Sequence, residues 1–133
     1  MKKTIGYVLS HTHWDREWYL SFQLFRMRLV DMLDTLIPYL EQHPEFPHFH
    51  LDGQTVCLED PEYVFELDAQ TVCLEDYLEV RPDQAERLRH LIEAGRIAVG
   101  PWYVLPDLQC IGQESILRNL SRGLALAQRF GVG

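Results

Sequence analysis

Short apolar segments alternate with amphipathic stretches along this 133-residue chain, and this alternation limits the fold more than any other feature. Residues 4–10, 46–51 and 97–100 are apolar runs of strand length. Residues 17–42 and 113–130 repeat apolar side chains at steps of three and four, which predicts two long helices. Because strands that alternate with helices form βαβ units, the sequence predicts an α/β protein with a parallel sheet.

Prolines and glycines indicate where the helices should end. Pro38 lies inside the first helical pattern, so we expect a kink or a break near Ile37, because proline cannot donate a helical hydrogen bond. A shorter helix should open at Pro82 and stop at Gly95. The apolar residues expected to be buried on the last helix are Ile116, Leu117, Leu120, Leu124 and Ala127.

A block of sequence occurs twice, 16 residues apart. Residues 51–60 read LDGQTVCLED, and residues 67–76 read LDAQTVCLED. Two copies are too few for a solenoid, so we interpret them as a tandem duplication around residues 51–76 of a single domain, residues 1–133. We expect one copy to supply a barrel strand while the other bulges out or adds a short extra unit. Gly53 favours the first copy as the barrel strand, because glycine suits a tight exit from a strand. The direct continuation of the second copy into residues 77–82 favours the second copy instead.

Composition and charge exclude several classes of function. The chain has 12 basic and 20 acidic residues, a formal net charge of −8 and no basic stripe, so no nucleic-acid partner is expected. Its 3 cysteines have no C-x-x-C spacing, which argues against a disulfide framework and favours a reducing, cytoplasmic location. The N-terminal apolar run is too short for a signal peptide, and no stretch reaches membrane-spanning length, so we expect no membrane partner.

His11, His13 and Asp15 form an H-x-H-x-D motif directly after the first predicted strand. Imidazole nitrogen and carboxylate oxygen are ligands that suit a divalent ion such as zinc. Alternate residues of an extended chain project to one side, so all three side chains can point into the same space. The competing interpretation is a polar turn in which Asp15 caps the next helix. Three ligand-type residues at this spacing favour the metal site.

Trp18 follows the motif by one turn of the predicted helix. Its flat apolar face suits stacking against a sugar ring. Burial of the indole in the core is the alternative, and side-chain chemistry alone leaves both interpretations open.

Four motifs follow one another along almost the whole chain. They are HTHWDREWY at residues 11–19, LDGQT at 51–55, LEDYLEVRP at 74–82 and GPWYVLPD at 100–107. In this order they resemble the N-terminal end of bacterial α-mannosidases of glycoside hydrolase family 38. The resemblance implies the N-terminal portion of a seven-stranded parallel (β/α) barrel, incomplete in this chain, and zinc-dependent retaining hydrolysis of α-mannoside oligosaccharides. We also expect the full-length parent to be a homo-oligomer.

The resemblance assigns roles to individual residues. His13 and Asp15 match the family's first two zinc ligands, and Trp18 matches the aromatic residue that lies against bound mannose. His11 matches no ligand, and we expect it to contact the ligand residues rather than the metal. Gln54 and Gln70, which occupy equivalent positions in the two repeats, are expected to do the same.

Further sugar contacts are expected where other predicted strands end. Asp52 and its duplicate Asp68 could bind sugar hydroxyls or orient a ligand histidine, because barrel sites assemble at the carboxyl ends of strands. The alternative for both is an Asx turn. Trp102, Tyr103 and Asp107 are expected at the same mouth, against the alternative of an aromatic loop that packs on a helix.

The chain also departs from the family pattern. The family's nucleophilic aspartate is expected beyond Gly133, and the acidic residue that usually follows the Pro-Asp pair is Leu108 here. We therefore expect a barrel segment that is inactive alone. Two alternatives stay open: a metal-dependent amidohydrolase or phosphoesterase, whose barrels also open with H-x-H, and a catalytically inactive fragment.

Overall fold

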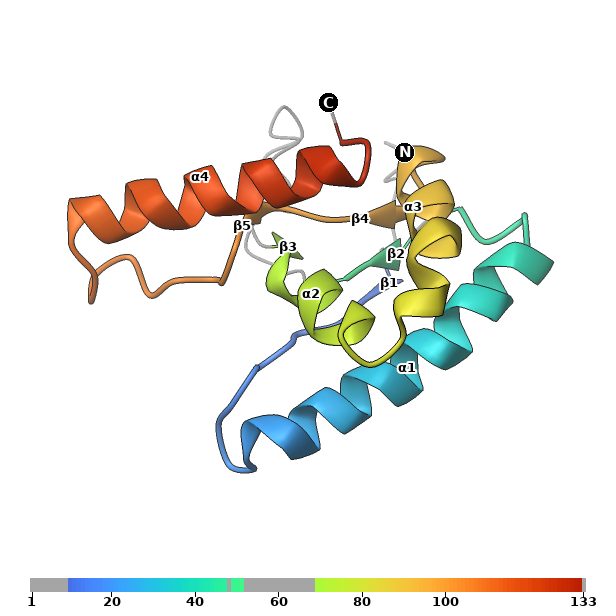
Figure 1. Ribbon diagram of the computed structural model, residues 1–133, viewed down its shortest axis with the longest axis horizontal. Helices are drawn as coiled ribbons and strands as arrows, with labels where there is room; N and C mark the ends of the chain where they lie inside the picture. Colours follow the sequence, from blue (N-terminus) through green and yellow to red (C-terminus); the bar gives the residue numbers. More distant parts are fainter. Residues whose placement is uncertain (1–9, 48, 52–68, 133) are drawn as a thin grey trace, which may run out of the picture.

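The computed structural model describes residues 10–47, 49–51 and 69–132 of the chain. Its elements, coloured along the sequence in Figure 1, are β1 (Ser10–His11), α1 (Phe22–Gln42), β2 (Phe49–His50), β3 (Ala69–Gln70), α2 (Val72–Leu78), the 3-10 turn η2 (Pro82–Gln84), α3 (Ala85–Glu93), β4 (Ile97–Ala98), β5 (Pro101–Trp102) and α4 (Gln113–Arg129).

The described strands pair in parallel throughout. β2 lies between β1 and β4, with Phe49 opposite Ser10 on one side and Ile97 on the other. β3 pairs with β5 in a second sheet, with Gln70 opposite Trp102. The expected α/β class with parallel strands is therefore confirmed for the described residues.

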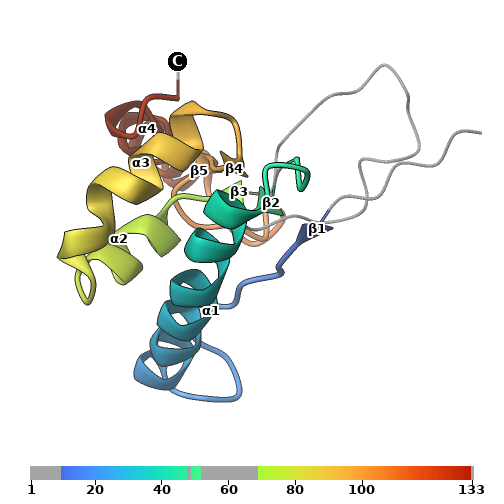
Figure 2. The ribbon, with the colours of Figure 1, turned by 90° about the vertical axis from the view of Figure 1, so that its right-hand side faces the viewer.

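The helices enclose the strands from two sides. α4 lies above the strands and α1 below them in both views (Figures 1 and 2). α2 and α3 pack against α1, and α4 runs along β5. Among the residues that the structure describes, no helix is long and apolar enough to cross a membrane.

Helix α1 differs from its prediction at both its start and its proline. It begins at Phe22 rather than near residue 17, and it continues through Pro38 to Gln42, so a break is wrong, while a kink at Pro38 stays a prediction. Proline removes one helical hydrogen bond, but Ile37 and Leu40 on either side of it are completely buried. Tertiary packing of the apolar face thus outweighs the local defect.

The shorter helices follow the sequence signals more closely. η2 begins at Pro82, and α3 ends at Glu93, before Gly95. Gly95 has a φ of 68°, the left-handed conformation that ends many helices at glycine. The predicted start and stop of this helical region are therefore confirmed. Helix α2, formed by the second copy of the repeat, was not predicted.

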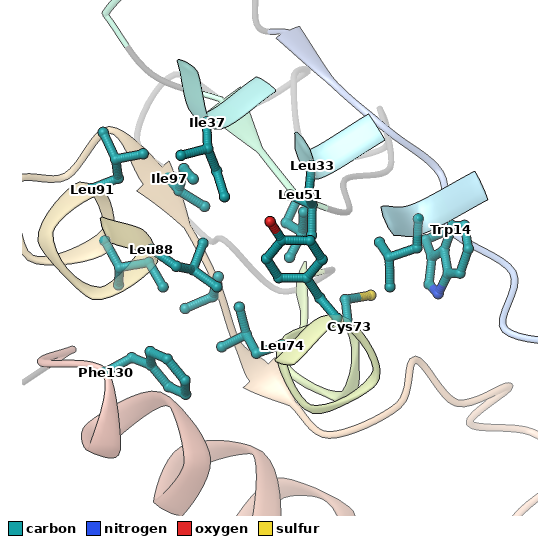
Figure 3. Packing of buried hydrophobic residues seen from close by; sticks show 14 of the residues in the cluster. Trp14, Leu33, Ile37, Leu51, Cys73, Leu74, Leu88, Leu91, Ile97 and Phe130 are labelled. Carbon is teal, nitrogen blue, oxygen red and sulfur yellow. The ribbon is translucent and has the colours of Figure 1, made fainter. Parts of the chain in front are cut away.

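The hydrophobic core lies where α1, α2 and α3 converge on β4. Leu33 of α1, Leu74 of α2 and Ile97 of β4 are almost completely inaccessible to solvent. Figure 3 shows them in one cluster, with Trp14 at its edge. The Tyr77 ring is also fully buried, and its hydroxyl donates to Asp34 Oδ1 over 2.8 Å. Asp34 thereby satisfies a polar group that burial would otherwise penalise.

Helix α4 buries only part of the predicted face. Ala127 is buried as predicted, and Ile116 and Leu120 are half-buried. Leu117 and Leu124, expected in the core, are 62% and 49% exposed, whereas Gly123 is buried. A Cβ atom added at Gly123 would lie 2.1 Å from the carbonyl oxygen of Pro101. The helix therefore turns its glycine toward β5, because only a residue without a side chain permits this approach.

We expect Gly123→Ala to lower the free energy of unfolding by about 1–3 kcal/mol, because the added methyl group meets backbone atoms of β5. Denaturant titration provides the measurement. In a helix with free space around the glycine, a Gly→Ala change would stabilise the protein by up to about 1 kcal/mol. The sign of the change in unfolding free energy therefore distinguishes close packing from free space. Gly112→Ala is the control, since nothing lies within 4 Å of its added Cβ atom. A Gly123→Ala protein as stable as the parent would contradict the close packing.

Candidate functional site

A cavity of about 530 Å³ opens beside the H-x-H-x-D motif. Two separate segments, residues 13–17 and 104–107, provide most of its walls. The lining residues are His13, Trp14, Asp15, Arg16, Glu17, Phe22, Gln70, Val104, Leu105 and Asp107. These segments follow β1 and β5, so the cavity lies at the carboxyl ends of parallel strands, where ligands of α/β proteins usually bind.

The first wall is an irregular loop between β1 and α1. Residues 16–20 form bends instead of the predicted helix, and α1 starts only after Ser21, whose carbonyl accepts from the amides of Leu24 and Phe25. Trp18 therefore does not lie one helical turn beyond Asp15. Tertiary contacts must hold this loop, because it has no regular secondary structure of its own.

His13 and Asp15 lie close together on this wall. His13 Nε2 and Asp15 Oδ1 are 3.8 Å apart, and their side chains are 52% and 39% exposed. Donor atoms around a tetrahedral zinc ion lie about 3.4 Å from one another, so a small side-chain rotation brings this pair to ligand geometry. One imidazole nitrogen and one carboxylate oxygen therefore fit part of a zinc shell.

His11 does not join this pair. It ends β1 with an exposed side chain, and its Nδ1 atom lies 3.2 Å from the carbonyl oxygen of Thr12. In the described part of the chain, no group of three or more His, Cys, Asp or Glu side chains is placed to hold a metal ion. The structure therefore does not support three ligands in the motif. Strand β1 ends at His11, so the rule that alternate side chains of a strand point to one side does not extend to His13 and Asp15.

The backbone on both sides of His13 is tied to the rest of the molecule. Trp14 is buried, and its ring meets Phe25 of α1 edge to face, with centroids 5.9 Å apart. Gln70 Nε2 donates to the carbonyl oxygen of Trp14 over 2.8 Å. The Thr12 hydroxyl donates to the carbonyl oxygen of Leu51. Gln70 was expected to support the site, and the structure places it on the cavity wall.

An ion pair fixes the residue that follows Asp15. Arg16 Nε and Nη2 donate to the two carboxylate oxygens of Asp76 over 2.8 and 2.9 Å. The Asp76 side chain is only 3% exposed. These hydrogen bonds raise the pKa of Arg16, and its guanidinium also lies 4.4 Å from the centre of the Phe22 ring. The paired geometry anchors the loop to helix α2.

The second wall is held by α4. Asn119 Oδ1 accepts from the amides of Tyr103 and Val104 over 3.0 and 2.9 Å, and Asn119 Nδ2 donates to the Val104 carbonyl over 2.6 Å. The Tyr103 hydroxyl donates to Glu75 Oε2 over 2.8 Å. Burial and this hydrogen bond raise the pKa of Tyr103. Residues 103 and 104 are therefore locked in place directly before Leu105 and Asp107.

The predicted sugar-contacting residues are scattered. Trp18 is 74% exposed beside Tyr19 and is not part of the cavity wall. Trp102 is buried in β5, and its carbonyl accepts from the amide and hydroxyl of Thr71. Asp107 does line the cavity. The remaining predicted site residues, which lie outside the described residues, are Asp52, Gln54 and Asp68. Sugar contact by these residues stays a prediction.

Sequence reasoning missed the residues that support the walls. Arg16 and Asp76 are 60 positions apart in the sequence. Asn119 lies in α4, where the prediction used the apolar side chains and not the polar ones. One signal was available, since Asp76 lies two residues after Leu74, the end of the apolar run of α2, and is followed by the aromatic Tyr77. An acidic residue among buried positions usually has a charged partner.

Comparisons of the sequence with known proteins give a family match. A family model described as "Glycosyl hydrolases family 38 N-terminal domain" matches residues 3–132. A protein of Halalkalibacterium halodurans named "Putative mannosylglycerate hydrolase" is 38% identical over 131 residues, which are 98% of this chain and 13% of that protein.

Two solved structures from Enterococcus faecalis share the fold. An alpha-mannosidase of strain V583 superposes with a TM-score of 0.78 and 39% identity over 93% of this chain and 12% of the other. A protein of glycosyl hydrolase family 38 gives a TM-score of 0.76 and 35% identity over 96% of this chain and 13% of the other. This chain therefore spans only a small part of the length of its relatives.

We expect Asn119→Ala to destabilise the protein by about 1–3 kcal/mol, because it leaves the amides of Tyr103 and Val104 without their acceptor. Hydrogen exchange at residues 103–107 should accelerate more than exchange elsewhere. Asn119→Asp is the matched control: it keeps the acceptor oxygen but loses the donor to the Val104 carbonyl and adds a charge, so exchange of the amides of residues 103 and 104 should accelerate less than in Asn119→Ala. Equal effects of the two changes would contradict the role given to Oδ1.

Proposed function

The chain belongs to glycosyl hydrolase family 38 and forms part of its N-terminal domain, and from this premise we propose that it contributes the metal-binding and one sugar-binding wall of a zinc-dependent α-mannosidase. The pair of donor atoms on His13 and Asp15, at the rim of a cavity, carries the proposal. Family membership speaks against the amidohydrolase and phosphoesterase alternatives.

His13 Nε2 and Asp15 Oδ1 are the atoms that would hold zinc in this chain. When bound, zinc supplies Lewis acidity and a fixed position for sugar hydroxyls. With two protein donors, the other coordination positions of the zinc ion are left for sugar hydroxyls, water or other residues of a larger enzyme. The loop contacts of Gln70 and Arg16 keep the two donors close together.

The other cavity residues suit a neutral sugar. Glu17 and Asp107 offer carboxylate oxygens that can accept hydrogen bonds from hydroxyl groups. Phe22, Val104 and Leu105 offer apolar surface for the C–H face of a sugar ring. Trp18 is exposed beside this loop, so its ring is accessible for stacking on a mannose unit.

We propose that the described strands are the start of a seven-stranded parallel barrel. The cavity follows the carboxyl ends of β1 and β5, which is where barrel enzymes place their sites. Retaining hydrolysis requires a nucleophilic carboxylate and an acid/base carboxyl group about 5 Å apart. By resemblance the nucleophile belongs beyond residue 133, so the reaction is proposed only for a larger enzyme that contains this segment.

The cellular setting of that enzyme is also a proposal. Cys110 is an exposed free cysteine, which is consistent with a reducing compartment such as the cytoplasm. A homo-oligomeric parent stays a prediction.

Zinc titration by calorimetry tests the metal site. We expect weak binding that His13→Ala and Asp15→Ala each abolish, because removal of either donor leaves one protein ligand. His43→Ala is the matched control, since His43 Nδ1 also pairs with a carboxylate two residues away, Glu45, at 2.8 Å, but does not line the cavity. Binding that survives in the His13 and Asp15 variants would refute the assignment.

An aryl α-mannoside assay with added zinc tests catalysis. We expect no detectable turnover from the 133-residue chain alone, because loss of a catalytic nucleophile usually lowers rates by several orders of magnitude. An active family 38 α-mannosidase serves as positive control for the assay. Metal-dependent turnover that disappears in Asp15→Ala would show instead that a nucleophile lies within these residues.

A further inference from the structure

We propose that Glu75 and Asp76, adjacent residues of α2, are positioning residues that hold the two opposite walls of the cavity. This inference rests on the proposed function, because one of those walls carries His13 and Asp15. It assigns this positioning role to the second copy of the duplicated block, residues 67–76, although the first copy contains the same Leu-Glu-Asp sequence.

Asp76 holds the wall with the metal donors. Its buried carboxylate binds Arg16 through two parallel hydrogen bonds, and Arg16 is the residue directly after Asp15. A buried carboxylate is stable only when a cation pairs with it, so the guanidinium has little freedom to leave. Arg26 Nε donates to the main-chain carbonyl of Asp76 over 3.0 Å and braces the same turn of α2 against α1.

Glu75 holds the opposite wall. Its Oε2 atom accepts from the Tyr103 hydroxyl over 2.8 Å and from Arg122 over 3.2 Å. The Arg122 guanidinium also lies 3.9 Å from the centre of the Tyr103 ring, so α2, α4 and the loop after β5 meet at one point. Tyr103 directly precedes Val104 and Leu105, which line the cavity.

Helix geometry explains how one dipeptide reaches both walls. Successive side chains on an α-helix are about 100° apart, so neighbouring residues face different directions. Gln70, from the same copy and just before α2, adds its hydrogen bond to the carbonyl of Trp14. The second copy thus contacts the residues on both sides of Asp15 and the base of the other wall. The spacing of the walls, and with it the separation of the metal donors from the apolar surface, depends on α2.

A purely structural ion pair elsewhere provides a comparison. Asp34 accepts from Arg81 over 2.6 and 2.8 Å and from the buried Tyr77 hydroxyl, but none of these residues lines the cavity. A change at Asp34 should therefore affect stability without acting on the loop of residues 12–19. Asp60, the counterpart of Asp76 in the first copy, tests whether the role belongs to one copy.

Zinc calorimetry and hydrogen exchange on the intact chain test the proposal together. We expect Asp76→Asn to weaken zinc binding by about 10-fold, the usual effect of losing a group that orients a metal ligand, and to accelerate exchange at residues 12–19. Asp34→Asn and Asp60→Asn should leave zinc affinity and this exchange unchanged. Glu75→Gln should accelerate exchange at residues 103–107, whereas Glu79→Gln, at the exposed end of α2, should not.

Arg16→Lys provides a variant with less risk to folding, because the Arg16 side chain is 43% exposed and lysine keeps the charge but not the two-pronged geometry. It should weaken zinc binding in the same direction, and combining it with Asp76→Asn should add little further loss. Full additivity of the two changes would overturn the proposal, because Asp76 would then not act through Arg16.

Two further outcomes separate this proposal from the proposed function. If the parent chain binds no zinc, the metal assignment fails, and exchange at residues 12–19 still decides the role of Asp76. If the parent binds zinc but Asp76→Asn changes neither affinity nor exchange, or Asp60→Asn changes both equally, the positioning role of the second copy is wrong.

Discussion

The ion pair between Arg16 and Asp76 is the contact on which the candidate site depends. The loop that carries His13 and Asp15 has no helical or strand hydrogen bonds to stabilise it, so its shape comes from tertiary contacts. Asp76 is buried and cannot give up its cation without leaving a charge unpaired in the interior. Together with the burial of Trp14 against Phe25, this pairing turns an irregular segment into a defined wall.

The cavity combines two kinds of chemistry on one surface. His13 and Asp15 bring the donor atoms of the proposed zinc site, and the loop after β5 brings apolar surface and the carboxylate of Asp107. Each segment follows the carboxyl end of a parallel strand, β1 in one sheet and β5 in the other, and such ends are where α/β proteins usually bind ligands. Under the proposed function, a sugar would be held there by its hydroxyls on one side and by its C–H face on the other.

The second copy of the duplicated block has its structure completed by contacts with distant segments. Both copies contain the residues Gln-Thr-Val-Cys-Leu-Glu-Asp and therefore share the same intrinsic propensities. In the second copy residues 72–76 begin α2, bury Cys73 and Leu74, and bring Glu75 and Asp76 to the two walls. The chain continues from the second copy into the buried Tyr77, and α2 packs against α1.

The sequence by itself determined the α/β class, the helix limits at Pro82 and Gly95, the family, and the proximity of His13 to Asp15. These follow from local periodicity, backbone preferences and short motifs, which act over a few residues. Only the tertiary structure decided that α1 continues through Pro38, that Gly123 rather than Leu117 faces β5, and that Trp102 is buried. It also decided that Arg16 meets Asp76. Each of these depends on which distant segment packs against the residue, and no local pattern contains that information.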